Sequence, residues 1–232
     1  NNISFNYPDY SRKMINNVSM DIKVNSTIGI IGPSGSGKST LANIISGLIT
    51  PSSGSISVDG IKIDKTNLVS WQRNIGYVSQ DVFLTDHSIS ENVAFGVNKE
   101  NINLDKVNLS LKQANLLDFI DELPNGINTI VGEKGVQISG GQRQRISIAR
   151  ALYWNPEVII FDEATSSLDG INEKYILNTI ENIEMKLIII IAHRLNTIKF
   201  CDKVILLNEG QIIDQGNFNS ISKRQKIIRD ME

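Results

Sequence analysis

The chain has little cysteine and no long hydrophobic run. Its single cysteine, Cys201, excludes an internal disulfide framework and suits a reducing compartment. The most apolar stretch, residues 187–192, has the length of a strand, far below the ~20 residues of a membrane-spanning helix. An excess of one charge is also lacking, because 23 basic and 25 acidic residues give a formal net charge of −2. No positive field therefore favours nucleic acid or an anionic membrane surface as the partner.

Short apolar runs bounded by turn residues dominate the two ends of the chain. Several runs are hydrophobic on both faces, which is typical of buried strands in a largely parallel sheet covered by helices. They lie at residues 3–7, 27–31, 75–79, 158–161, 187–192 and 204–207. The pattern predicts an α/β fold. Alternation around Asp59-Gly60 predicts an antiparallel hairpin at residues 55–63, and residues 211–214 predict another.

The middle of the chain changes from strand to helix patterns. Two helices are predicted at residues 105–117 and 142–154, with a loop at Pro124-Asn125-Gly126 between them. We therefore expect a single domain over residues 1–232. Residues 1–82 and 155–232 would form its core with a β subdomain, and residues 83–154 an inserted helical subdomain. A charged terminal helix is expected at residues 217–232.

A glycine-rich loop follows the predicted strand at residues 27–31. It matches the pattern GxxxxGKS through Gly32, Pro33, Ser34, Gly35, Ser36, Gly37, Lys38, Ser39 and Thr40. Glycines let backbone N–H groups turn towards phosphate oxygens, Lys38 offers a charge to the β and γ phosphates, and Ser39 offers a hydroxyl to Mg²⁺. Strand, loop and following helix pattern coincide, which favours a nucleotide site over a simple turn.

Two carboxylates, Asp162 and Glu163, end the apolar strand at residues 158–161. Packing does not require two acids there, and open α/β sheets bind ligands at the carboxyl ends of their strands. We expect Asp162 to hold Mg²⁺ and Glu163 to orient or deprotonate the water that attacks a γ-phosphate. The alternatives are a helix cap for Asp162 and a solvated loop acid for Glu163.

A second sequence suited to phosphate precedes the predicted helix at residues 142–154. In Ile138-Ser139-Gly140-Gly141-Gln142, the serine hydroxyl and the backbone N–H groups can surround an anion at a helix N-terminus. Helix capping by serine alone would require neither two glycines nor a glutamine. The chain thus carries two phosphate cradles, and one nucleotide site explains only one of them.

Together these motifs resemble the nucleotide-binding domain of an ATP-binding cassette (ABC) transporter, whose signature LSGGQ stands here as ISGGQ. The resemblance runs from about residue 3 to residue 216, with the motifs in the family's order. It implies a P-loop NTPase of the RecA-like type, with a mainly parallel sheet core, an antiparallel β subdomain and an inserted α-helical subdomain. It also implies ATP and Mg²⁺ as ligands and ATP hydrolysis coupled to transmembrane transport.

The resemblance gives roles to four further residues. Tyr7 matches the aromatic that stacks on adenine, although it could be an ordinary strand aromatic. Gln80 matches the Q-loop glutamine that touches Mg²⁺ and the attacking water. Asp169, in Ser167-Leu168-Asp169, matches the D-loop aspartate that crosses a dimer interface, and His193 matches the switch histidine at the γ-phosphate. The roles of Trp71 and His87 stay open.

The resemblance also explains the second cradle. In the family, two domains pack head to tail, so the signature of one caps the γ-phosphate held by the other. The expected partner is therefore a second copy of the chain or a paralogous ABC ATPase domain, and Ser139, Gly140, Gly141 and Gln142 become part of the partner's nucleotide site.

An X-loop of the kind found in ABC exporters is expected at residues 129–135, which read Thr-Ile-Val-Gly-Glu-Lys-Gly and resemble it, with Glu133 as the acid. Phe83 and Leu84 are candidates for a groove that faces the transmembrane domain. The chain also lacks an initiator Met. We expect the carboxy-terminal ATPase of an exporter of the bacterial lipid, oligosaccharide or multidrug type. Its membrane spans would lie upstream on the same polypeptide, with the ATPase on the cytoplasmic side of the inner membrane. The alternatives are an importer subunit, a soluble ABC ATPase that acts on nucleic acid, and a regulatory module without turnover.

Overall fold

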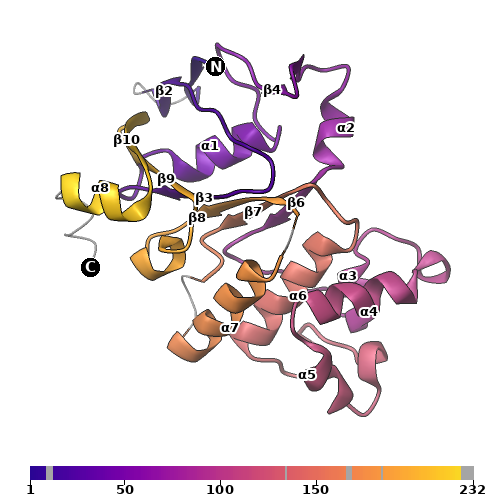
Figure 1. The fold of residues 1–232 in the computed structure, drawn as a ribbon. Helices are drawn as coiled ribbons and strands as arrows, with labels where there is room; N and C mark the ends of the chain where they lie inside the picture. The colour runs from indigo at the N-terminus through magenta and orange to yellow at the C-terminus, as the bar shows by residue number, and fades with distance from the viewer. Residues whose placement is uncertain (9–12, 134, 166–168, 184, 226–232) are drawn as a thin grey trace. The chain divides into compact units, whose positions relative to one another are not determined.

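The computed structural model describes residues 1–8, 13–133, 135–165, 169–183 and 185–225 of the chain (Figure 1). The chain forms two compact units. The first comprises Asn1–Ile75, Glu157–Glu163 and Met185–Glu232, and the second comprises Gly76–Pro156 and Ala164–Glu184. Among the residues described, no helix is both long and apolar enough to cross a membrane.

A mostly parallel sheet forms the centre of the first unit. Its strands there follow the order β10-β9-β3-β8-β7. Their bounds are Thr27–Ile31 (β3), Val158–Asp162 (β7), Leu187–Ile191 (β8), Lys203–Asn208 (β9) and Gln211–Gly216 (β10). Strand β3 is parallel to β8 and β9, β7 is parallel to β8, and only β10 runs antiparallel to its neighbour β9. The sheet has a sixth strand, β6 (Ile75–Val78). Its first residue belongs to the first unit and its other residues belong to the second. The predicted α/β class is confirmed.

The register of this sheet aligns the carboxyl ends of three strands. Ile191 of β8 lies opposite both Ile30 of β3 and Asp162 of β7. Because parallel strands end at a common edge, Gly32, Glu163 and His193 leave the sheet at the same side.

Two small antiparallel pairs complete the β structure of the first unit. Strand β1 (Ile3–Phe5) pairs with β2 (Ile15–Val18), which the sequence pattern did not predict. Strands β4 (Ser57–Val58) and β5 (Ile61–Lys62) form the predicted hairpin. Its two turn residues, Asp59 and Gly60, both have positive φ, as the favoured two-residue hairpin turn requires.

The helices of the first unit are α1 (Lys38–Ile45), α2 (Leu68–Gln72) and α8 (Phe218–Arg224), with a 3₁₀ turn at Leu195–Ile198. Helix α1 starts directly after the glycine-rich loop and packs against β7. Arg224 Nε and Nη2 hold both Asp214 oxygens at 3.0 and 2.8 Å and bind α8 to β10. These hydrogen bonds lower the pKa of the Asp214 carboxyl to about 2. Of the terminal helix expected at residues 217–232, the structure shows α8, and residues 226–232 lie outside the described part.

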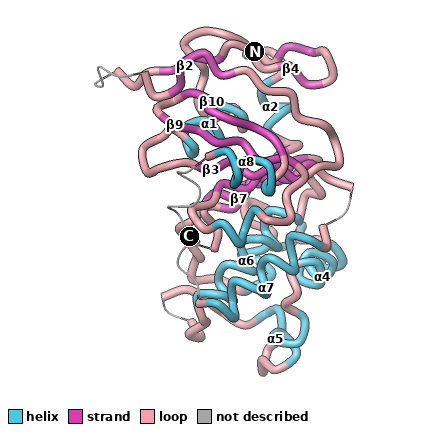
Figure 2. The backbone as a smooth tube through the Cα atoms, turned by 60° about the vertical axis from the view of Figure 1, so that its left-hand side comes forward, coloured by secondary structure: helices cyan, strands magenta, loops and turns pink. Residues whose placement is uncertain are grey.

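The second unit is helical. It contains α3 (Ile89–Val93), α4 (Leu104–Gln113), α5 (Leu117–Asp121), α6 (Gly140–Leu152) and α7 (Gly170–Glu181), with 3₁₀ turns at Lys99–Asn101 and Gly126–Asn128. Helix α6 is its centre, because it packs against α3, α4 and α7. Figure 2 shows α4 and α7 beside it. Its inward side chains, among them Ile146, Ile148 and Leu152, are buried.

The helix predicted at residues 105–117 ends earlier than expected. Asn115 adopts a φ of 55°, so α4 ends at Gln113 and the shorter α5 begins at Leu117. Asparagine tolerates this left-handed conformation better than other non-glycine residues, and a helix cannot continue through it. Helix α7 was not predicted.

Two helices of the second unit begin with the same reciprocal cap. In α6, Ser139 Oγ accepts a hydrogen bond from Gln142 N at 3.2 Å, and Gln142 Oε1 accepts one from Ser139 N at 2.8 Å. In α3, Ser88 and Glu91 make the equivalent pair. The start of each helix is thus fixed by its own sequence.

Replacing Ser139 by alanine removes one such cap. We expect Ser139→Ala to lower the free energy of unfolding by about 1 kcal/mol, because the Gln142 N–H loses its acceptor. Ser88→Ala, the corresponding variant in α3, should cause a larger loss, because Ser88 is buried and its Oγ also contacts Ser90 Oγ at 3.0 Å. Urea denaturation measures both. A Ser139→Ala variant as stable as the parent chain would show that the cap does not stabilise α6.

Candidate nucleotide site

The glycine-rich loop between β3 and α1 is shaped by close backbone approach. Gly32 has a φ of 154°, and a Cβ atom built on it would lie 1.9 Å from the Leu207 carbonyl oxygen. Gly37 has a φ of 105°, and its Cβ would lie 2.6 Å from the Met14 carbonyl oxygen. No larger residue fits at either position without displacing backbone, so these two glycines are structural requirements of the loop.

Lys38 lies within the curve of the loop. Its ammonium group donates hydrogen bonds to the carbonyl oxygens of Gly32 at 2.9 Å and Pro33 at 3.0 Å. Burial lowers the pKa of Lys38, while the negative charges of Glu163 and Asp162 oppose that shift. Ser36 Oγ is buried and has no hydrogen-bond partner among the described residues. A phosphate-binding loop presents a positive charge and hydrogen-bond donors to its ligand. Lys38 and the unpaired Ser36 hydroxyl match this description.

The acid pair stands at the end of β7, with Asp162 as its last residue and Glu163 directly after it. Ser39 Oγ donates a hydrogen bond to Asp162 Oδ1 at 3.1 Å, so the first predicted Mg²⁺ ligand contacts the second. Glu163 has a φ of 51°, which is uncommon for a residue other than glycine, and its N–H donates to the Ile191 carbonyl oxygen at 3.0 Å. Strained backbone of this kind concentrates at functional positions.

Glu163 also contacts the predicted switch histidine. Its Oε1 lies 2.6 Å from His193 Nε2, and the Glu163 side chain is 16 % exposed against 34 % for His193. The first unit therefore brings Lys38, Ser39, Asp162, Glu163 and His193 to one edge of its sheet, although His193 lies 155 positions after Lys38 in the sequence (193 − 38).

Tyr7 lies beside the start of α1. Its hydroxyl is 3.5 Å from Thr40 Oγ1, and its ring meets Phe5 edge to face with centroids 4.9 Å apart. The remaining predicted loop residues, Ser34 and Gly35, continue the same turn, and Gly35 has a φ of 74°. The structure thus places Tyr7, two residues after β1, next to the end of the phosphate loop.

The other predicted site residues belong to the second unit. Ser139 and Gly140 are exposed at the start of α6, and Gln142 forms the cap described above. Gln80 is exposed, and the neighbouring Ser79 carbonyl accepts a hydrogen bond from Gln144 Nε2 of α6 at 3.2 Å. The segment that carries Gln80 is therefore attached to the helix that carries the signature.

Asp169 caps helix α7. Its Oδ1 accepts hydrogen bonds from the N–H groups of Ile171 at 3.1 Å and Asn172 at 2.9 Å, and its Oδ2 accepts from Asn172 Nδ2 at 2.8 Å. The bonds from Asn172 lower the pKa of the Asp169 carboxyl most. The two preceding residues of the predicted D-loop, Ser167 and Leu168, lie outside the described residues. Asn172 was not predicted, and only its spacing of three from Asp169 could have indicated it.

The predicted groove and X-loop residues of the second unit differ in exposure. Thr129 and Val131 of the X-loop are buried, whereas Phe83 and Glu133 are exposed. Phe83 is 72 % exposed, so it does not pack in the core. Its carbonyl oxygen accepts a hydrogen bond from Arg150 Nη1 at 3.0 Å, and Arg150 also stacks on Phe95 at 4.9 Å. Glu133 is exposed, and Ile130 and Val136 nearby are exposed apolar residues.

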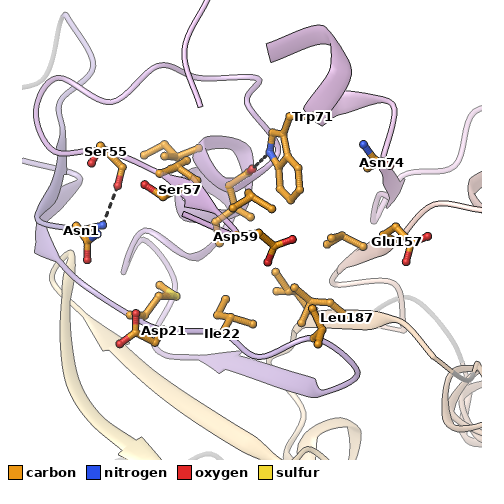
Figure 3. A pocket seen from close by; sticks show the side chains of 18 of the residues that line it. Asn1, Asp21, Ile22, Ser55, Ser57, Asp59, Trp71, Asn74, Glu157 and Leu187 are labelled. Carbon is orange, nitrogen blue, oxygen red and sulfur yellow. Dashed lines mark hydrogen bonds between the residues drawn. The ribbon is translucent and has the colours of Figure 1, made fainter. Parts of the chain in front are cut away.

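A cavity of about 750 Å³ lies elsewhere in the first unit (Figure 3). None of residues 32–40 lines it. Trp71, whose role the sequence left open, is one of its walls, and Trp71 Nε1 donates a hydrogen bond to the Ile45 carbonyl oxygen at 2.8 Å. Trp71 is thus a structural residue that joins α2 to the end of α1.

Comparison with known proteins shows the family of the chain. The ABC transporter family model matches residues 15–166, more than half of the chain. The chain is 43% identical over 97% of its length to the leukotoxin export ATP-binding protein LtxB of Aggregatibacter actinomycetemcomitans, and covers 32% of that protein. It is 39% identical over 93% of its length to the ATP-dependent lipid A-core flippase of Cupriavidus metallidurans, of which it covers 37%.

A solved structure with the same fold was also found. It is described as a bacterial Atm1-family ABC exporter with ATP bound, and it matches 99% of this chain and 40% of its own with a TM-score of 0.88 and 36% identity. This chain spans about a third of the length of the two curated relatives named above. From the family match, the shared fold and the order of its motifs, the chain belongs to the ABC transporter family.

Proposed function

We propose that the chain is the ATP-binding and ATP-hydrolysing motor domain of an ABC exporter, which works as a head-to-tail dimer and drives a transmembrane domain. The observation that carries this proposal is the Glu163–His193 pair at 2.6 Å, formed where the phosphate loop and the acid strand leave the sheet. A partly buried carboxylate held by a histidine, at the sheet edge that also carries Lys38, fits the hydrolysis of a phosphoanhydride. The similarity to a leukotoxin export protein and a lipid A-core flippase supports the export direction.

ATP is the proposed substrate of the loop. Backbone N–H groups of the loop and the Lys38 charge would hold its β and γ phosphates, and Tyr7, beside Thr40, would stack on the adenine. Mg²⁺ would be held by Ser39 and Asp162 of the first unit, and it would neutralise phosphate charge when bound. The resemblance to the family proposes Gln80 as a further ligand. Mg²⁺ needs only a few ligands from the protein, because phosphate oxygens and water would complete its coordination shell.

Hydrolysis follows from the positions of Glu163 and His193. Glu163 takes a proton from water as the water oxygen attacks the γ-phosphorus, and the bond from that phosphorus to the β–γ bridging oxygen breaks. The products are ADP and inorganic phosphate. His193 holds the Glu163 carboxylate through the 2.6 Å contact, and Lys38 stabilises charge on the transferred group.

The exposed start of α6 supports the dimeric arrangement. Ser139 Oγ accepts from Gln142 N, which leaves the hydroxyl hydrogen available to an anion. The first N–H groups of a helix have no intrahelical acceptor, so Gly140 and Gly141 can donate to the same anion. We propose that this anion is the γ-phosphate bound by a second copy or a paralogous domain, and that Asp169 contributes across the same two-fold interface.

The transmembrane partner is proposed to meet the second unit. The exposed Phe83 and the exposed Glu133 supply an apolar and an acidic contact for it. The proposed membrane spans lie upstream on the same polypeptide, which places the ATPase at the cytoplasmic side of the membrane. The proposed division into a core, residues 1–82 and 155–232, and a helical subdomain, residues 83–154, assigns these contacts to the subdomain.

Glu163→Gln tests the proposed hydrolysis. We expect turnover of ATP to fall by about 100-fold or more, because glutamine cannot accept the proton, while ATP binding to the loop persists. Phosphate release and fluorescent-nucleotide binding measure the two properties. Glu157→Gln makes the same chemical change just before β7, at the opposite end of that strand, and should leave both unchanged. Wild-type turnover in Glu163→Gln would remove Glu163 from the mechanism.

The dimeric arrangement predicts a concentration effect. If each site needs the signature of a second copy, the ATPase rate per molecule of this chain should rise with its concentration and level off once dimers predominate. A dilution series with parallel measurement of mass in solution checks this. Turnover that is independent of concentration in a sample shown to be monomeric would contradict the shared site.

A further inference from the structure

The second glycine of the signature has a specific neighbour. Gly141 is buried in the first turn of α6, and a Cβ atom built on it would lie 2.2 Å from Asn172 Oδ1 and 2.5 Å from Asn172 Cγ. The Asn172 Cβ atom itself would be 3.0 Å away. Because Gly141 has no side chain, the Asn172 amide of α7 can occupy the space where a Cβ atom would lie.

The Asn172 side chain has little freedom to move away. Its Nδ2 donates to Asp169 Oδ2 at 2.8 Å, and its backbone N–H donates to Asp169 Oδ1 at 2.9 Å. Hydrogen bonds to a carboxylate are stronger than those between neutral groups, so the amide is held with its oxygen towards Gly141. Helices α6 and α7 pack together in the same unit.

We propose that Asn172 is a positioning residue that fixes the start of α6 to the start of α7. Asp169 orients the amide, and the amide oxygen rests on Gly141, so Ser139 and Asp169 are held at a set separation. On this account Gly141 is glycine because it must admit Asn172. The inference rests on the proposed role of the signature as the cap of a partner's nucleotide.

A pair of substitutions separates this role from another explanation. Gly141 could instead be glycine because its backbone must approach the nucleotide. If Gly141 is glycine in order to admit Asn172, Gly141→Ala should lower kcat by roughly tenfold or more through displacement of α6. Adding Asn172→Gly should then raise kcat to the level of Asn172→Gly alone. Glycine is needed at position 172, because alanine would retain the Cβ atom 3.0 Å from the new methyl group.

Steady-state ATPase kinetics, fluorescent-nucleotide binding and melting temperature are measured for the parent chain, both single variants and the double variant. Asn172→Gly alone should lower kcat severalfold and leave nucleotide binding unchanged, because the phosphate loop is not altered. Gly170→Ala is the matched control for folding. It also lies in a first helical turn, a Cβ atom there has open space, and its melting temperature should equal that of the parent.

Recovery of kcat in the double variant supports the proposal, including when Gly141→Ala alone does not fold. A double variant that folds and stays as slow as Gly141→Ala overturns it, as does a Gly141→Ala variant with parental kcat. Ser139→Arg, assayed in parallel, distinguishes failure of the proposed function from failure of the inference about Asn172. If it abolishes turnover, the proposed function stands whatever the rescue shows. If it hydrolyses ATP at the parental rate, the capping role fails and the inference fails with it.

Discussion

The parallel register of β3, β8 and β7 is the constraint on which the proposed active site depends. Ile191 lies level with both Ile30 and Asp162, so three chain segments leave the sheet at one edge. One turns into the phosphate loop, one ends in Glu163 and one leads to His193. A slip of one residue in either pairing would invert the faces of the buried strand and separate these groups.

Local features then fix each group at that edge. The loop curls tightly because Gly32 and Gly37 bring its backbone against carbonyl oxygens of neighbouring segments. Glu163 adopts a positive φ directly after β7, and His193 meets its carboxylate at 2.6 Å. A partly buried charge is costly when it has no partner. Within the unit, the Lys38 ammonium donates to two carbonyl oxygens, and the Glu163 carboxylate contacts His193.

The sequence predicted the strands around the proposed site better than the helices. Strands β3, β7, β8 and β9 were predicted correctly, because burial on both faces requires a characteristic residue pattern. The roles given to the glycine-rich loop and the acid pair stay predictions. Helix α7 and strand β2 were missed. Strand β2, with the sequence Ile-Asn-Asn-Val, pairs with β1 although it is only four residues long and half polar. The contact of Asn172 with Gly141 depends on how two helices pack, and no spacing in the sequence encodes that.

The central claim is that each ATP site is built from two chains, and mixing two inactive variants tests it directly. Lys38→Ala disables the phosphate loop and Ser139→Arg disables the signature, so each homodimer should be inactive. In a mixed dimer, the intact loop of one chain meets the intact signature of the other. An equal mixture should recover roughly a quarter of the parental rate, because about half of the dimers are mixed and each has one intact site. Subunit exchange shown by fluorescence transfer, without any recovery of ATPase activity, would contradict the account.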